Sequence, residues 1–396
     1  MELLNTSPED KAIKYTIDFV RIPSFSGEEK ELALHIRDLL RDQGFDKVII
    51  DRVGNVIAIV KGTTWNKPLI LEGHMDHVDP GNLELWHYKP FSAKIVENKV
   101  YGRGTVDMKA ALASMVAAAE YMLKHSFKRT LALVFTVLEE PAEGVGFKIA
   151  IEETVKEKPF LVILGEATSL NVNLGHRGRA LIKTVIKGKT AHASMPHLGL
   201  NPIIALSKMI KYIGKIALPE HGILGKATIA PTIINCSPKC SSQVPDLCEI
   251  ILDRRTILGE DERDILKPFT IVHEGLASEG YKVEIGIFTE TIKCWTGAKV
   301  DVKYFFPSWL ISKKSSLAVK SLSVIRSKVN PNAEFKIWNF STDGVYSAGE
   351  RNIPTIGFGP GNEKLAHQPN EHISIEDIRK ATRGYMGLIR EYALEK

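Results

Sequence analysis

The sequence has few of the features that mark membrane-bound or secreted proteins. No apolar run approaches the roughly 20 residues that a membrane-spanning helix needs. The first residues, MELLNTSPEDKAIKY, carry acidic side chains early and contain no apolar stretch of the kind found in a secretory leader. These absences predict a cytoplasmic protein that has no membrane partner.

Cysteine is also scarce. The chain has four cysteines, Cys236, Cys240, Cys248 and Cys294, and none of them forms a CxxC pair. The first three lie close enough in the sequence for a small metal site to be conceivable. We favour free thiols in a reducing cytoplasm, because disulfides are rare in that compartment.

Charge of neither sign dominates the chain. The 52 basic and 47 acidic residues leave a net charge of +5, and the basic residues form no run. Because nucleic-acid-binding proteins concentrate their basic residues, we expect no nucleic-acid partner. The composition, 44% apolar and 25% charged, is ordinary for a globular protein, and 396 residues are long for a single core. We therefore expect two domains.

Apolar strands alternate with helical patterns in two separated parts of the chain. Helices are predicted at about 8–21, 27–43, 107–123 and 144–156, and buried strands at 55–60, 68–73, 131–138 and 160–165. The same alternation returns in 315–329, 353–359 and a helix from about 374 onwards. This pattern predicts an α/β sheet with both faces covered, formed by residues 1–178 and 293–396.

The segment between these two parts has a different pattern of predicted elements. Residues 179–292 contain predicted elements in the order strand, helix, strand, strand, helix, strand. This order is that of the ferredoxin-like split motif. The sequence therefore predicts a smaller domain, 179–292, inserted into the larger one.

Acidic and histidine residues follow the carboxyl ends of the apolar strands or open a helix. In an open α/β sheet, this is where binding sites form. Each residue alone has an ordinary structural explanation, but so many at the ends of elements favour a bound cation. Nitrogen and carboxylate ligands suit zinc, with cobalt or manganese as substitutes. The candidates are His74, Asp76, Asp107, Glu139, Glu140, Glu166 and His367.

The charge of these candidates favours two metal ions. Asp107, Glu140 and Glu166 would supply three negative charges, and a bridging hydroxide a fourth, against the four positive charges of two divalent ions. Such pairs lie roughly 3.5–4 Å apart and activate the water between them. One acidic side chain must stay free to take the proton from this water, and Glu139, beside Glu140, is placed for that role.

The stretch LEGHMDHVDPG brings a third titratable residue, His77, close to His74 and Asp76. Successive side chains of a strand point to opposite faces, so His74 and Asp76 share one face and His77 takes the other. The two metals already have ligands. We therefore expect His77 at the rim of the site or packed against a neighbour.

Five segments resemble, in order and spacing, the acetylornithine deacetylase, succinyl-diaminopimelate desuccinylase and aminoacylase family of di-zinc hydrolases. They are GHMD, GRGTVDMKAALASM, LEEPAEG, GEAT and AHQPNEH, and the resemblance runs from about residue 10 to the end. It implies a zinc-exopeptidase-like mixed sheet sandwiched by helices. It also implies that the inserted ferredoxin-like domain is a lid and dimerisation domain.

The resemblance also assigns the metal ligands. By analogy with the family, His74 and Glu166 bind one zinc ion, Glu140 and His367 bind the other, and Asp107 bridges both. Asp76 would orient His74, and Glu139 would be the general base. The peptide bond after Asp107 is expected to be cis, as in the family.

The inserted domain carries a second set of implied residues. In KGKTAHASMPHLGLNP, His192 matches the family histidine that reaches the active site of the partner subunit and stabilises the oxyanion. This role requires a homodimer. Asn235 and Arg255 match family positions that contact the substrate and its carboxylate, and Arg177 is a further candidate; a surface ion pair is the alternative for each arginine.

The segments GHRGR, SPKC, DRRTILGE, YFFPSW, FSTDGV and GFGPG are most similar to the YgeY-type branch, a hydrolase group linked to selenium metabolism. Family members with Glu at the position of Glu166 tend to be deacylases or carboxypeptidases. We therefore predict hydrolysis of a small N-acetyl, N-succinyl or N-carbamoyl amino acid. The alternatives are a carboxypeptidase or dipeptidase acting on short peptides and, more remotely, a binding or scaffold protein without catalysis.

Overall fold

The computed structural model describes residues 7–394, apart from the side chains of residues 64–66. Residues 1–6, which begin the segment where we expect no leader, lie outside the described residues. Among the described residues, no helix is both long enough and apolar enough to cross a membrane.

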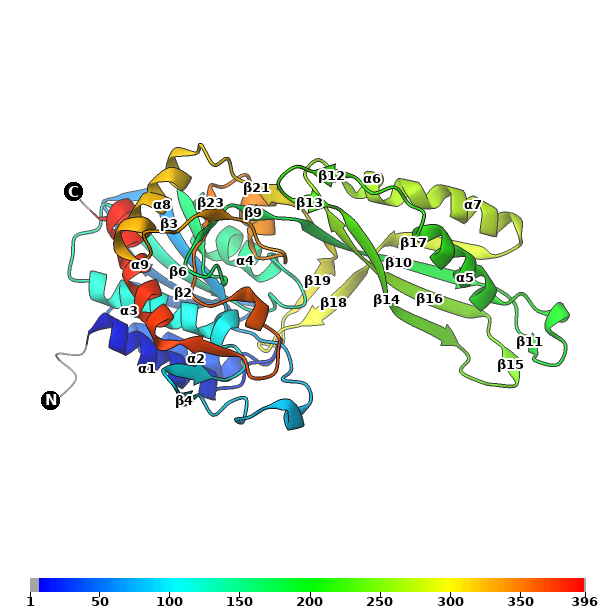
Figure 1. The fold of residues 1–396 in the computed structure, drawn as a ribbon, viewed down its shortest axis with the longest axis horizontal. Helices are drawn as coiled ribbons and strands as arrows, with labels where there is room; N and C mark the ends of the chain where they lie inside the picture. Colours follow the sequence, from blue (N-terminus) through cyan, green and yellow to red (C-terminus); the bar gives the residue numbers. More distant parts are fainter. Residues whose placement is uncertain (1–6, 395–396) are drawn as a thin grey trace. The chain divides into compact units, whose positions relative to one another are not determined.

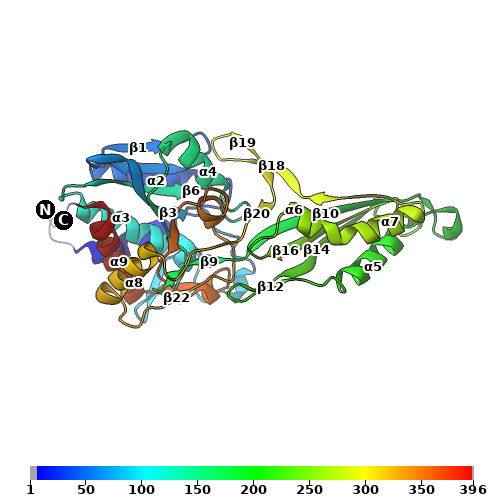
Figure 2. The ribbon, with the colours of Figure 1, turned by 90° about the horizontal axis from the view of Figure 1, so that it is seen from above.

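The described chain forms two compact units (Figures 1 and 2). The first comprises the chain up to His176, Thr291–Val300 and the chain from Leu310 onwards, and the second comprises Arg177–Glu290 and Asp301–Trp309. The sequence analysis places 301–309 in the larger domain, but this segment belongs to the second unit. The reason is strand pairing: β20 (Phe305–Phe306) pairs with β10 (Gly178–Lys187).

The first unit is built on a mixed sheet, as expected. Its order is β1-β2-β6-β3-β7-β23-β8-β22. The central strands β6, β3, β7 and β23 are parallel, whereas β1, β2 and β6 pair antiparallel. The strands are β1 (Lys47–Ile50), β2 (Val56–Val60), β3 (Thr64–His74), β6 (Arg129–Thr136), β7 (Leu161–Leu164), β8 (Val172–Asn173), β22 (Phe335–Lys336) and β23 (Thr355–Gly357).

Helices and loops cover both faces of this sheet. Every residue of β2 and β7 is buried, although alternate side chains point to opposite faces, so neither face is open there. The helices of this unit are α1 (Pro8–Arg21), α2 (Lys30–Asp42), α3 (Ala110–Met122), α4 (Val145–Ile149), α8 (Ser316–Lys328) and α9 (Ile375–Ala393). Short strands β4 (Lys94–Val96), β5 (Lys99–Tyr101) and β24 (His372–Ser374) form a separate small sheet.

The second unit has the predicted order of elements. Its antiparallel sheet runs β14-β16-β10-β17, with β14 at one edge. Buried and half-buried residues alternate along β10 and β16, because one face packs on helices and the other does not. The remaining elements are α5 (Pro202–Ile213), β14 (Thr228–Ser237), β16 (Leu247–Thr256), α6 (Glu262–Leu266), α7 (Thr270–Ser278) and β17 (Lys282–Ile287).

The expectation of four free thiols is wrong for two of them. Cys236 on β14 and Cys248 on β16 are direct partners in the strand register and form a disulfide. Cys240 and Cys294 are free. The spacing of cysteines along the chain could not reveal this pair, because only the register of β14 against β16 brings the two side chains together. The cysteine metal site is excluded, since two of its three thiols are used in the disulfide.

Candidate metal centre

The predicted ligands lie at one edge of the central sheet. β6, β3, β7 and β23 are neighbours and run parallel, so their carboxyl ends meet at the same edge. His74 ends β3, Glu139 and Glu140 follow β6, and Glu166 follows β7. His367 lies in the loop after β23, and Asp107 lies just before α3, with a cis peptide bond to Met108 as expected.

One group of potential metal ligands consists of His74, Asp107 and Glu166. Nε2 of His74 lies 2.9 Å from Oδ1 of Asp107 and 3.4 Å from Oε1 of Glu166. His74 is buried, and the two carboxylates are nearly so. These three atoms are close enough to contact a single ion.

A second group shares Asp107 with the first. Nε2 of His367 lies 3.0 Å from Oδ2 of Asp107 and 3.1 Å from Oε2 of Glu140. Asp107 therefore directs one carboxylate oxygen to each group. The imidazole of His367 is 48% exposed, so this side of the centre is open to a small molecule.

The hydrogen bonds of His74 identify the nitrogen that faces the carboxylates. Nδ1 lies 2.9 Å from the backbone oxygen of Asp76, which can only accept, so Nδ1 carries a hydrogen. In the neutral ring, the lone pair of Nε2 then points at Asp107 and Glu166. Lone pairs facing carboxylate oxygens repel unless a proton or a cation lies between them. This geometry fits a metal ion bound through Nε2.

Without cations, this cluster of buried carboxylates is electrostatically unfavourable. Burial and the charge of Asp107 raise the pKa of Glu166 to about 7, and the same two causes raise the pKa of Glu140. Burial would lower the pKa of His74, but contacts with carboxylates, Asp107 foremost, raise it well above the usual value. So many buried negative charges favour a cation at the same place.

Two carboxylate oxygens of the centre are buried without a hydrogen-bond partner. They are Oε2 of Glu166 and Oε1 of Glu139. An unpaired buried carboxylate oxygen is unfavourable. A cation bound by His74, Asp107 and Glu166 would satisfy the oxygen of Glu166. A water molecule between the two ligand groups would satisfy the oxygen of Glu139. The residues present therefore fit a pair of divalent cations.

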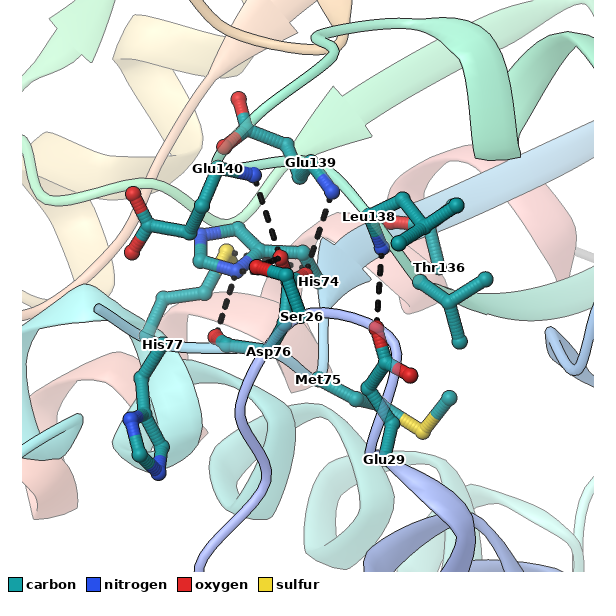
Figure 3. A network of polar contacts seen from close by, with 12 residues as sticks. Ser26, Glu29, His74, Met75, Asp76, His77, Thr136, Leu138, Glu139 and Glu140 are labelled. Atoms are coloured by element: carbon teal, nitrogen blue, oxygen red, sulfur yellow. Dashed lines mark hydrogen bonds and ion pairs between the residues drawn. The ribbon is translucent and has the colours of Figure 1, made fainter. Parts of the chain in front are cut away.

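The carboxylate of Asp76 contacts more than His74. Its Oδ1 lies 3.6 Å from Nδ1 of His74, and the backbone oxygen of Asp76 lies 2.9 Å from the same nitrogen. That Asp76 orients His74 stays a prediction. The carboxylate accepts hydrogen bonds from the backbone N–H groups of Glu139 (3.1 Å) and Glu140 (3.2 Å) (Figure 3). The hydroxyl of Ser26 donates a third at 2.7 Å. Asp76 thus holds the loop that carries these two glutamates.

Glu371 supports the centre and is missed by the sequence analysis. It is fully buried, accepts hydrogen bonds from the backbone N–H groups of Val106 (2.7 Å) and Asp107 (3.2 Å), and pairs with Arg103 at 2.6 Å. The segment AHQPNEH contains both His367 and Glu371. The acidic residue Glu371, four positions after His367, is the signal in the sequence that could have identified it.

His77 packs away from the two ligand groups, as expected. Its Nε2 accepts a hydrogen bond from the backbone N–H of Ser24 at 3.0 Å, and Nδ1 lies 2.9 Å from the backbone oxygen of Val78. Its ring contacts Phe25 and Phe91, with centroid distances of 4.9 and 5.3 Å. Neither of the two ligand groups includes His77.

The other candidates lie in the second unit. Arg255 pairs with Asp253 at 2.7 Å, and Arg177 donates to the backbone oxygen of Lys226 at 2.9 Å. Asn235 is exposed on β14. The exposed His192 accepts at Nδ1 from the backbone N–H of Ser194, which leaves Nε2 to carry the hydrogen of the neutral ring. The roles of these four residues stay predictions.

The mixed sheet and the paired carboxylate–histidine groups define the class of metal-dependent hydrolases. A family model described as peptidase family M20/M25/M40 matches residues 70–391, and the chain belongs to this family. This confirms the resemblance to the deacylase and desuccinylase family. The chain is therefore a metallohydrolase of the amidohydrolase or peptidase kind.

Individual relatives cover nearly the whole chain. YgeY of Escherichia coli (strain K12), which is named as uncharacterized, is 29% identical over 90% of this chain and 88% of its own length. A succinyl-diaminopimelate desuccinylase of Wolbachia pipientis subsp. Culex pipiens (strain wPip) is 27% identical over 96% and 93%. Among solved structures, the Bacillus subtilis YXEP protein, titled a dinuclear metal-binding peptidase, is 17% identical, covers 96% of this chain and 97% of its own, and has a TM-score of 0.68. The last likeness shows the fold.

Proposed function

We propose that this protein hydrolyses the amide bond of a small N-acyl amino acid, with an acetyl, succinyl or carbamoyl group, using two divalent cations per subunit. Zinc is the proposed metal, with cobalt or manganese as substitutes. The observation that carries the proposal is the sharing of Asp107 between two ligand groups beside a glutamate, Glu139, that belongs to neither group. The desuccinylase relative supports the choice of an acylated amino acid.

The two groups would hold the cations through His74, Asp107 and Glu166 on one side and through Asp107, Glu140 and His367 on the other. When bound, such cations activate water and polarise the substrate carbonyl.

Glu139 is proposed as the general base. Its carboxylate is buried, one oxygen has no partner, and burial, with a further contribution from Glu166, raises its pKa well above the usual value. A carboxylate held beside the two cations can take a proton from the attacking water and later donate it to the leaving amine. Asp76 accepts a hydrogen bond from the backbone N–H of Glu139. This bond limits the directions in which the carboxylate of Glu139 can point.

Substrate recognition is proposed for the second unit. The Nε2–H of His192 is free to donate to a developing oxyanion, because Nδ1 is occupied by Ser194. Arg255, Asn235 and Arg177 are proposed to contact the substrate and its carboxylate. Arg255 would have to exchange part of its pairing with Asp253 for the substrate.

A homodimer through the second unit completes the proposal. β14 is an edge strand, and its residues Ile233 and Ile234 are 53% and 50% exposed. Exposed apolar edge strands are usually covered or paired in native proteins. A second copy of the chain that pairs along β14 would cover this strand. In this dimer, His192 is proposed to act in the active site of the partner subunit.

An exopeptidase is the second candidate. The description of the YXEP protein as a peptidase favours it, since amide hydrolysis of a short peptide needs the same centre. The panel that separates the two comprises N-acetyl, N-succinyl and N-carbamoyl amino acids and dipeptides, assayed with zinc, cobalt and manganese. We expect hydrolysis of at least one acylated amino acid and slower cleavage of dipeptides. Faster cleavage of dipeptides would favour the peptidase.

The Glu139→Gln variant tests the mechanism in the same assay. We expect two metal ions per subunit, as in the unchanged protein, but a turnover reduced by a factor of about 100 or more, because the general base is lost. Metal content by elemental analysis is the control. Near-normal turnover of Glu139→Gln would show that another group takes the proton.

A further inference from the structure

Four consecutive backbone N–H groups at the end of β6 bond to side chains instead of a neighbouring strand. Val137 donates to Oδ1 of Asn55 at 2.9 Å, and Leu138 donates to Oε1 of Glu29 at 3.2 Å. Glu139 and Glu140, the next two residues, donate to Asp76. The acceptors come from three separate segments of the chain. Figure 3 shows the carboxylate of Glu29 beside Leu138 and that of Asp76 beside Glu139 and Glu140.

Leu138 adopts an unusual backbone conformation at this point. Its φ is +62°, in the left-handed region that residues other than glycine rarely adopt. Leu138 immediately precedes Glu139, so the turn at Leu138 sets the direction in which the side chain of Glu139 leaves the backbone. A conformation of this kind persists only where its surroundings hold it. The hydrogen bond that Leu138 donates to Glu29 acts on this residue directly.

The side chain of Glu29 does not cap its own helix. It precedes α2 but makes no side-chain capping bond to it. Instead, its fully buried carboxylate turns to Leu138 and to the backbone N–H of Gly27, 2.8 Å away. Glu29 and Leu138 are more than a hundred residues apart along the chain, so this contact forms only in the folded protein.

We propose that Glu29 is a positioning residue, which holds Leu138 in the left-handed conformation and thereby directs Glu139 towards the metal centre. The proposal rests on the proposed role of Glu139 as general base. It assigns to Glu29 an effect on turnover that is transmitted through the backbone, without contact with the substrate or the metal ions.

The test compares Glu29→Ala with Glu29→Gln. The glutamine oxygen can still accept from Leu138, whereas alanine cannot. We expect kcat of Glu29→Ala to fall by about tenfold to a hundredfold, as for loss of one buried hydrogen bond, with KM within about twofold and metal content unchanged. Glu29→Gln should keep kcat within about threefold. Equal loss in both variants, or none in Glu29→Ala, would overturn the proposal.

A rescue experiment separates the backbone effect from a general loss of stability. Glycine adopts positive φ without strain, so Leu138→Gly should recover part of the kcat lost in Glu29→Ala. Leu138→Ala in the same background is the matched control, because it removes the same packing but keeps the backbone strain. Recovery by both substitutions, or by neither, contradicts the proposed mechanism. Melting temperatures of all variants identify any that fail to fold.

Hydrogen exchange supplies a readout that does not depend on catalysis. In metal-free protein, the backbone amides of Leu138, Glu139 and Glu140 should exchange about tenfold faster in Glu29→Ala than in the unchanged protein, and no faster in Glu29→Gln. If the unchanged protein hydrolyses nothing in the substrate panel, the proposed function fails, and this exchange pattern still decides the role of Glu29. If catalysis is normal and exchange is unchanged in Glu29→Ala, only the positioning role fails.

Discussion

His74 and His77 stand three residues apart, and their surroundings shift their pKa values in opposite directions. His74 faces carboxylates, which raise its pKa well above the usual value despite burial. His77 packs on Phe25 and Phe91, and its burial, followed by the nearby charge of Lys109, lowers its pKa to about 3. The alternation of side chains along the strand end accounts for this difference.

The lowered pKa of His77 predicts a pH-dependent contribution to stability. The unfolded chain binds a proton at His77 below about pH 6.5, whereas the folded protein does not until about pH 3. This contribution is complete above pH 6.5 and is lost as the pH falls towards 3. Between about pH 6 and pH 3, the free energy of unfolding of the unchanged protein should therefore fall relative to that of His77→Gln by about 1.4 kcal/mol per pH unit, with little change above pH 6.5.

Urea unfolding of both metal-free proteins at pH 7, 6 and 5 measures this difference. Other carboxylates titrate alike in the two proteins and cancel in the comparison. A difference between the two proteins that stays constant from pH 7 to pH 5 would show that His77 takes up its proton in the folded state.

At the scale of elements, the pairing of β14 with β16 brings two cysteines together that are twelve residues apart. Thiol titration checks this pair. The denatured, unreduced protein should show two reactive thiols, Cys240 and Cys294, and four after reduction, because Cys236 and Cys248 are joined. Four thiols without a reductant would mean that the disulfide does not form in the purified protein.

The loop after β6 shows, at the scale of elements, which contacts the sequence predicts and which it does not. The apolar run 131–138 and the pair Glu139–Glu140 predict a strand end that carries a site, and the structure has both. The acceptors that hold the loop, Glu29 and Asp76, belong to segments 109 and 63 residues away. No local pattern reveals such pairs, because they depend on how β3, β6 and the start of α2 pack together.

At the scale of the whole molecule, the proposed dimer makes a prediction about mixed subunits. A His192→Ala subunit keeps its metal centre, and a Glu139→Gln subunit keeps its histidine. If His192 acts on the partner's centre, each mixed dimer has one complete site. An equal mixture should then recover roughly a quarter of the unchanged activity, since half of the dimers are mixed.

The control for this experiment is each variant alone, which should remain almost inactive. Subunits are mixed by co-expression with two affinity tags, and the purified mixed dimer should show about half of the unchanged activity, because one of its two sites is complete. Activity of the mixture no higher than the mean of the two variants would argue against a histidine that acts in the partner subunit.

The sequence by itself determined the alternation of strands and helices, the inserted ferredoxin-like order of elements, and the chemical types at the strand ends. These features depend on local periodicity and on residue type, which are visible along the chain. Only the tertiary structure decided that Glu371 accepts from the backbone of Val106 and Asp107, that the carboxylate of Asp76 holds the glutamate loop, and that Cys236 is joined to Cys248. The physical reason is that each of these contacts depends on the register and packing of segments far apart in the chain.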